Sequence, residues 1–215
     1  MTERVRIEQF LDASCAWCHG ALETNRRVLD ELAADPAIPP FELVWRWIRL
    51  HPVRESGAPL RAGLVEEALA FVTSVGVRLD PMRYTREHDP ELAHRLLTVV
   101  RDDPARDALP GPWSLARAVL NATFVDGVDL TDLAALRGAV ERHGMAVPER
   151  IWHQLDTTEL GRSAVAMDHA RARVVQLDGV PRMVVHGQIV PTWIDPDEVR
   201  TRLRAAILDG AAAPV

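Results

Sequence analysis

The feature that most constrains the fold is the placement of the two cysteines, which lie in the stretch SCAWCHG at residues 14–20. The run VRIEQFL at residues 5–11 precedes them and is typical of a strand. Residues 20–34 carry apolar side chains at helical spacing, which predicts an amphipathic helix. Residues 41–50, FELVWRWIRL, alternate and predict a second strand. This order predicts a parallel βαβ unit, hence an α/β fold with both cysteines at the first strand–helix junction.

A helical block separates this unit from the end of the chain. Its helical segments, punctuated by Pro, Gly and Asp, cover residues 64–75, 90–100, 113–124, 130–143 and 148–173. After the block, short apolar runs at residues 183–185 and 188–190 flank a His-Gly dipeptide and predict a hairpin with a tight turn. A last helix is predicted from residue 195 to about residue 208. The predicted order is therefore βαβ, a helical block, then ββα.

The position of the cysteines at the start of a helix suits thiol chemistry. Unpaired N–H groups and the positive end of the helix dipole meet there and favour a thiolate at Cys15. Cys18 lies one turn further in, within disulfide reach, and is expected to be more buried. Cys15 is therefore the expected nucleophile and Cys18 the thiol that resolves the mixed disulfide. A CxxC pair in this setting indicates a thioredoxin-like redox site.

Two neighbours of the cysteines are candidates for the same site. His19 lies four residues after Cys15, so the two share a face if the helix starts at the cysteines. There His19 would polarise the thiolate or hydrogen-bond the leaving sulfur; the alternative is a solvent-facing histidine in the first turn. Trp17, between the cysteines, is expected to face outward and to contribute to substrate binding and redox potential.

Zinc binding and haem attachment are two other uses of such a pair. A closed zinc site needs four ligands, whereas the sequence has no second CxxC and no histidines spaced as in HExxH. The letters CAWCH do fit the c-type haem attachment pattern. Against haem, the charged start MTERVRIEQF contains no apolar run that resembles an export signal. Dithiol redox chemistry is therefore favoured, with no metal ligand assigned.

Charge and hydropathy bear on partners and location. The formal net charge is -6, so the sequence has no basic footprint for nucleic acid or for a membrane surface. No segment is long and apolar enough to span a bilayer. Together with the charged start, this predicts a cytoplasmic protein, and in that compartment a cysteine pair is more often catalytic than structural.

Three stretches together resemble a known family. They are FLDASCAWCHGA at residues 10–21, the helical block including residues 116–145, and DGVPRMVVHGQIVPTWIDPDEVRTRL at residues 178–203. They resemble the DsbA-like thioredoxin-fold oxidoreductases, most closely the FrnE-like branch of cytosolic dithiol oxidoreductases. The resemblance implies a thioredoxin fold, residues 1–58 and 174–215, with an inserted α-helical domain at residues 59–173. The activity it implies is thiol–disulfide exchange.

The same resemblance implies how substrate would meet the cysteines. It predicts that the Val180–Pro181 bond is cis and that Pro181 packs opposite Cys15 and Cys18. The backbone of Val180 would then pair with an extended substrate segment in the manner of strand addition. The expected partners are proteins with disulfides or dithiols, or small thiols. No bound cofactor is implied, although a thiol such as glutathione or mycothiol can serve as co-substrate.

The sequence departs from the family pattern at two positions. Ala16 stands where the FrnE-like branch has proline, which loosens the helix start and alters the redox potential in an unspecified direction. Gln9 stands where the family commonly has a buried acid that accepts protons, and the adjacent Glu8 is expected on the other face of the strand. Proton transfer to and from Cys18 would then use water or Asp12, or be slow.

Two alternative functions remain within the same fold. Glutathione-dependent 2-hydroxychromene-2-carboxylate isomerases and kappa-class glutathione transferases resemble this architecture, lack the resolving cysteine and activate a bound thiol with a serine near the Cys15 position. This chain has Ser14, but it also has both cysteines, which favours redox chemistry. The second alternative is a non-catalytic thioredoxin-fold binding module, in which the two thiols would not cycle.

Overall fold

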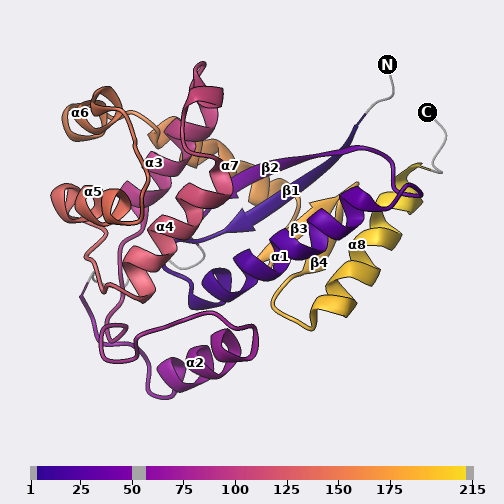
Figure 1. The fold of residues 1–215 in the computed structure, drawn as a ribbon, viewed down its shortest axis with the longest axis horizontal. Coiled ribbons are helices and arrows are strands. Elements are labelled where there is room, and N and C mark those ends of the chain that lie inside the picture. The colour runs from indigo at the N-terminus through magenta and orange to yellow at the C-terminus, as the bar shows by residue number, and fades with distance from the viewer. Residues whose placement is uncertain (1–3, 50–56, 212–215) are drawn as a thin grey trace.

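The computed structural model describes residues 4–49 and 57–211 and contains a four-stranded mixed sheet (Figure 1). The strands are β1 (Val5–Leu11), β2 (Phe41–Trp47), β3 (Arg182–Val185) and β4 (Gln188–Pro191). Their order in the sheet is β2-β1-β3-β4. β2 runs parallel to β1, whereas β3 pairs antiparallel with both β1 and β4. This confirms the predicted parallel pair and hairpin; the predicted end of the second strand at Leu50 lies outside the described residues.

The described part of the chain also contains helices of one to five turns. They are α1 (Ala16–Ala34), α2 (Leu64–Ser74), α3 (Glu91–Asp102), α4 (Pro112–Phe124), α5 (Leu133–Arg142), α6 (Glu149–Thr157), α7 (Arg162–Val174), α8 (Pro196–Ala211) and the 3-10 turn η1 (Arg106–Ala108). None of these helices is long and apolar enough to cross a membrane.

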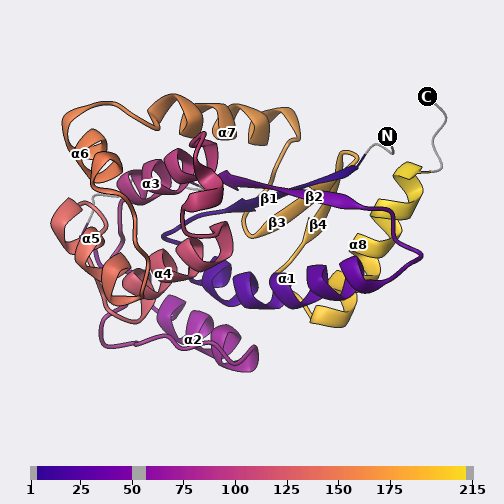
Figure 2. The ribbon, with the colours of Figure 1, turned by 45° about the horizontal axis from the view of Figure 1, so that its top comes forward.

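The helices cover both faces of the sheet. α1 and α8 pack together on one face, and α3 and α7 contact β2 from the other (Figure 2). The remaining helices of the block gather at one end of the sheet, where α2 and α4 pack on α1. The architecture is thus a thioredoxin fold with a helical insertion. α7, which the prediction placed inside the inserted domain, packs on the sheet itself; the division at residues 58 and 174 stays a prediction.

Two apolar clusters form the core, and their positions differ. One lies between the sheet and the helices α1 and α8 and includes Ile7, Met183 and Leu203. The larger cluster extends from the far end of β1 into the helical insertion, and it contains Phe124 of α4 together with Cys18. The cysteine end of α1 is therefore packed between the sheet and the inserted helices.

Residues 148–173, predicted as one helical segment, form two helices, α6 and α7. The chain turns between them at Gly161, which has a positive φ of 84°. A Cβ added at Gly161 would lie 3.0 Å from the backbone oxygen of Arg95, so both the turn and the close approach favour glycine there. The buried Arg95 guanidinium donates to carbonyls at the end of α6, including that of Leu155. These contacts are long-range, which is why helical spacing alone did not show the break.

A buried charged network fastens α3 and α7 to the sheet. Glu8 of β1 accepts hydrogen bonds from Arg46 of β2 and from Arg171 of α7. Asp168 of α7 accepts from Arg46 and from Arg101 of α3. Glu8 and Asp168 are almost completely buried, and these guanidinium partners stabilise the charge of each carboxylate.

Candidate active site

A tight turn after β1 places Cys15 at the start of α1. The Asp12 carboxylate accepts from the Ser14 N–H at 2.9 Å and from the Ser14 hydroxyl at 2.8 Å. The Cys15 N–H then donates to the Asp12 carbonyl at 3.1 Å. Cys15 has an extended backbone and is the N-cap of α1, with its Sγ accepting from the Cys18 N–H at 3.3 Å. Charge on this sulfur is therefore stabilised by a helix N–H and by the helix dipole.

The helix begins at Ala16, earlier than the apolar spacing of residues 20–34 indicated, because Cys15 supplies its cap. Ala16 is completely buried, and Trp17 is half-buried and packs against the larger core cluster. Ala16 therefore faces the core, whereas Trp17 keeps part of its surface exposed.

Cys18 lies beneath Cys15 and differs from it in exposure. Cys15 is half-buried, Cys18 is completely buried, and both thiols are free in this structure. The Asp12 N–H donates to Cys18 Sγ at 3.4 Å. Burial raises the pKa of the Cys18 thiol well above its ordinary value, and the neighbouring Cys15 and the Asp12 carboxylate raise it further. Cys18 is consequently a protonated thiol unless a neighbour takes its proton.

The loop before β3 faces the cysteines. The Val180–Pro181 bond is cis, as predicted. The Cys15 thiol lies 4.0 Å from the Val180 carbonyl oxygen, across a sequence separation of 165 residues. Val180 is only 8% exposed, and Pro181 is also buried. The structure thus brings Cys15, Cys18 and the Val180–Pro181 loop together at one end of the sheet.

His19 does not face solvent, so that alternative is wrong. Its ring is buried, stacks on Phe124 with the ring centroids 5.3 Å apart, and its Nε2 donates to the Arg78 carbonyl at 2.8 Å. Burial lowers the pKa of His19 from 6.5 to about 4, although the Arg78 bond opposes the shift. The ring is therefore neutral near pH 7 and carries no positive charge with which to polarise Cys15. Its contacts tie α1 to the inserted helices.

His94 of α3 is a neighbour of the site that the sequence did not indicate. Its Nε2 accepts from the Ala13 N–H at 3.0 Å and lies 3.2 Å from the Asp12 Oδ1. In a neutral ring this nitrogen accepts from Ala13; in a protonated ring it would donate to Asp12 instead. Burial alone would raise the pKa of Asp12, but His94 and the Ser14 donors outweigh it and hold that pKa below its ordinary value.

Gln9 and Glu8 lie as the strand pattern predicted. Gln9 is completely buried, and neither its amide nitrogen nor its amide oxygen makes a hydrogen bond to the residues that the structure describes. Glu8 faces Arg46 and Arg171, away from the cysteines. Asp12 is thus the acid next to the buried thiol. Within residues 4–49 and 57–211, no three His, Cys, Asp or Glu side chains are grouped as metal ligands would be.

A dithiol at the start of a helix, opposite a cis-proline loop on a mixed sheet, defines the class of thioredoxin-fold dithiol proteins. The family model described as the DSBA-like thioredoxin domain matches residues 6–204 of this chain. The chain therefore belongs to this family of thiol–disulfide oxidoreductases, as the sequence resemblance implied. Among curated proteins, no sequence relative matches the chain.

Solved structures share the fold. A probable DsbA oxidoreductase from Streptomyces coelicolor superposes with a TM-score of 0.77 at 21% identity, covering 99% of this chain and 93% of that one. The cytosolic disulfide reductase DsbM from Pseudomonas aeruginosa, in a structure with GSH, has a TM-score of 0.63 at 16% identity, with coverages of 95% and 100%. DsbA from the same organism has a TM-score of 0.57 at 14% identity, with coverages of 99% and 86%.

Proposed function

We propose that this protein exchanges thiols and disulfides in the cytoplasm, with Cys15 as the nucleophile and Cys18 as the resolving thiol. The observation that carries the proposal is the contrast between the two sulfurs. Cys15 is half-buried and its Sγ accepts from the Cys18 N–H at the start of α1, whereas Cys18 is buried beneath it with a raised pKa. An accessible thiolate above a buried thiol is the arrangement that directs a substrate disulfide to the first sulfur.

The exchange proceeds in two steps. The Cys15 thiolate attacks one sulfur of a substrate disulfide, forms a mixed disulfide and releases the other substrate sulfur as a thiolate. The Cys18 sulfur then attacks Cys15, forms the Cys15–Cys18 disulfide and releases the second substrate thiolate. The substrate gains two electrons and the protein loses two; the reverse sequence oxidises a dithiol. Reduction potentials decide the direction.

Asp12 is the proton acceptor that we assign to the second step. Cys18 must lose its proton to attack, and Gln9, which stands where the family commonly has an acid, cannot accept it. The Asp12 backbone contacts the Cys18 sulfur, and the Asp12 carboxylate is held ionised beside His94. The carboxylate therefore can take the proton during the attack and share it with the His94 ring.

The loop at Val180–Pro181 and the indole of Trp17 are the surfaces we assign to the substrate. The Val180 carbonyl points at the Cys15 sulfur, so an extended segment that pairs with this backbone would bring its own sulfur to Cys15. Both protein disulfides and small disulfides satisfy this geometry. DsbM, whose structure was solved with GSH, supports a small thiol as co-substrate. The cytosolic location of DsbM supports the assignment to the cytoplasm; the assignment to the FrnE-like branch rests on the sequence resemblance.

The test separates this proposal from the two alternatives. Cys15→Ser should abolish turnover of a disulfide substrate, and Cys18→Ser should accumulate a mixed disulfide on Cys15 that intact mass spectrometry detects. Ser14→Ala is the matched control, because its hydroxyl bonds to Asp12 and the mechanism leaves it out of the chemistry. Activity lost in Ser14→Ala but kept in Cys15→Ser would support the serine-dependent transferase instead. Two thiols that never cycle with a thiol reductant would support the binding module.

A further inference from the structure

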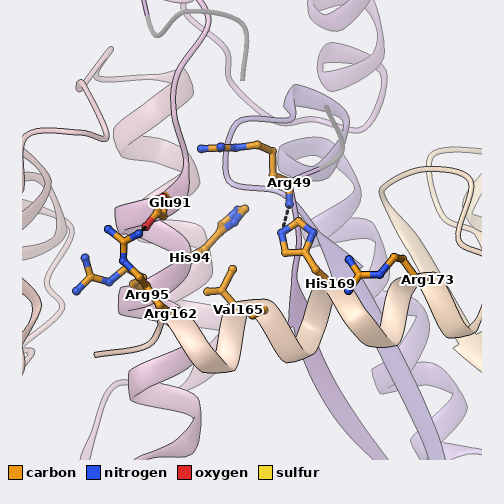
Figure 3. Close-up of a pocket in the computed structure, with 9 residues that line it drawn as sticks. Arg49, Glu91, His94, Arg95, Arg162, Val165, His169 and Arg173 are labelled. Carbon is orange, nitrogen blue, oxygen red and sulfur yellow. Dashed lines mark hydrogen bonds and ion pairs between the residues drawn. The ribbon is translucent and has the colours of Figure 1, made fainter. Parts of the chain in front are cut away.

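A cavity of about 540 Å³ lies between α3, α7 and the end of β2 (Figure 3). Four arginines line it: Arg49, Arg95, Arg162 and Arg173. One acid, Glu91, and two histidines, His94 and His169, complete its polar wall. This volume is in the range of small-molecule sites. A concentration of arginine in a protein whose net charge is -6 is not explained by composition.

The positive charge of the cavity is only partly balanced. Arg162 is paired with Glu91 at 3.2 Å and also with Glu159, and Arg49 is paired with Asp89. Arg95 donates to neutral carbonyl groups, which satisfy its N–H groups and leave its charge in place. Arg173 is exposed on α7. Among the described residues, ion pairs thus form at Arg49 and Arg162 but not at Arg95 or Arg173, and the Asp12 carboxylate lies against His94.

The two histidines that line the cavity each accept a backbone N–H through Nε2. His169 has its pKa lowered by burial first and then by the positive charge of His94 and Arg173. Its Nε2 accepts from the backbone N–H of Arg49 at 3.2 Å, and the Nε2 of His94 accepts from the backbone N–H of Ala13. A neutral His169 ring whose Nε2 accepts in this way carries its hydrogen on Nδ1 and can donate it to an anion.

The cavity adjoins the redox site through a shared residue. His94 lines the cavity and binds the backbone of Ala13, two residues before Cys15. Two residues span at most roughly 7 Å of chain. An anion held by Arg162 and Arg173 would therefore lie on the α7 side of the loop that carries the nucleophile.

We propose that this cavity binds the carboxylates of a small anionic disulfide or thiol and so selects the co-substrate, an inference that rests on the proposed exchange activity. Guanidinium forks bind carboxylates in a bidentate manner. The cavity volume fits a molecule of tripeptide size. Arg162 and Arg173 lie at opposite ends of the α7 face that lines the cavity, so they anchor separate carboxylates. Glu91 opposes this binding, because its charge repels a carboxylate and occupies Arg162.

The experiment compares an anionic disulfide, oxidised glutathione, with a neutral one, hydroxyethyl disulfide. The double variant Arg162→Gln/Arg173→Gln should raise KM for oxidised glutathione at least about tenfold, because the loss of even one charged hydrogen bond of about 1.4 kcal/mol has that effect. Its kcat/KM for hydroxyethyl disulfide should not change. Glu91→Gln should lower KM for oxidised glutathione. Arg27→Gln is the matched control, because Arg27 is an exposed arginine of α1 outside the cavity.

Two outcomes overturn the inference. One is an unchanged KM for oxidised glutathione in the double variant; the other is an equal loss with both disulfides, which would indicate structural damage without charge recognition. If the wild-type protein turns over neither disulfide, the proposed function fails. Calorimetry with S-methylglutathione, which cannot undergo thiol–disulfide exchange, then tests the binding site independently of activity. Binding that the double variant weakens supports the site; no binding by the wild type overturns it.

Discussion

Two carboxylates of the first strand region, Glu8 and Asp12, are both buried and both have a pKa below the ordinary value, but for different reasons. Burial alone would raise each pKa. At Glu8 the guanidinium groups of Arg171 and Arg46 outweigh it; these partners are permanently charged. At Asp12 the partners are the His94 ring and Ser14, of which one can itself gain or lose a proton.

The partners of Glu8 and Asp12 give one carboxylate a structural role and the other a role in proton transfer. Glu8 lies within β1 and contacts Arg171 of α7, whereas Asp12 follows the end of β1 and lies beside His94 of α3. Glu8, locked between two arginines, can only hold α7 to the sheet. Asp12, beside the Cys18 sulfur and a titratable ring, can also move a proton. What surrounds each acid thus decides its role.

The largest effect is expected when Glu8 is neutralised. Glu8→Gln should reduce the free energy of unfolding near pH 7 by about 3 kcal/mol, the low end for breaking a buried pair, because Arg46 keeps Asp168 as a partner while Arg171 loses Glu8. Urea unfolding measures this loss. Exchange activity in the folded fraction should persist, since Glu8 faces away from the cysteines.

The loss at Glu8 has a defined pH dependence. Because the folded pKa lies below the unfolded value of 4.5, this ionised carboxylate stabilises the fold above about pH 4.5. The contribution disappears as the pH falls through the folded pKa. The difference between wild type and Glu8→Gln should therefore shrink in acid. A difference that stays constant down to low pH would contradict the ion-pair account.

His19 gives a second, smaller effect on stability in acid. Its pKa in the folded protein, about 4, lies below the ordinary 6.5. Between these two pH values His19 is therefore protonated in the unfolded chain and neutral in the folded protein. The wild type should lose roughly 3 kcal/mol of unfolding free energy from this source by about pH 4. His19→Phe should be less stable near pH 7, through the lost Arg78 bond, but should show a flatter acid limb. Parallel pH profiles for the two proteins would refute the buried neutral ring.

Neutralising Asp12 should affect rate more than stability. Asp12→Asn should slow the Cys18 attack on a preformed mixed disulfide by about a hundredfold near pH 7, the lower range for losing a general base. Rapid quench with an alkylating agent follows this step. If Asp12 serves only as a charge that raises the Cys18 pKa, the same variant should be faster, because the thiolate would form more easily. A Cys18 attack that is as fast as in the wild type or faster would therefore exclude Asp12 as the proton acceptor.

The smallest effect is expected at Ser14. Ser14→Ala removes the hydroxyl that donates to Asp12 and should cost about 1 kcal/mol of unfolding free energy. Turnover should stay within about threefold of wild type, since the Ser14 N–H still supports the turn. A complete loss of turnover in a stably folded variant would indicate that Ser14 itself takes part in the chemistry.

Local patterns predicted the parts of the molecule that local residues determine. The strand at residues 5–11, the helix after the cysteines and the hairpin near residue 186 follow from alternation, helical spacing and turn residues. The cis bond at Val180–Pro181 followed from the family resemblance. These features place both cysteines and the loop opposite them.

Long-range packing produced what the sequence did not show. His94 is 81 residues from its backbone partner Ala13, and no motif marks it. The burial of His19 depends on Arg78 and Phe124 in the insertion, so helical spacing alone left its exposure undecided. The break at Gly161 depends on the approach of Arg95. Each case needs a partner that becomes adjacent only in the folded chain.

In the proposed mechanism Cys15 and Cys18 form one redox couple. The direct measurement equilibrates the protein in glutathione buffers of graded potential, quenches with an alkylating agent and determines intact mass. Two dominant forms are expected, a doubly alkylated dithiol and an unalkylated intramolecular disulfide, that interconvert over a single two-electron transition of about 30 mV per tenfold change in ratio. Both thiols remaining alkylatable in every buffer would contradict it.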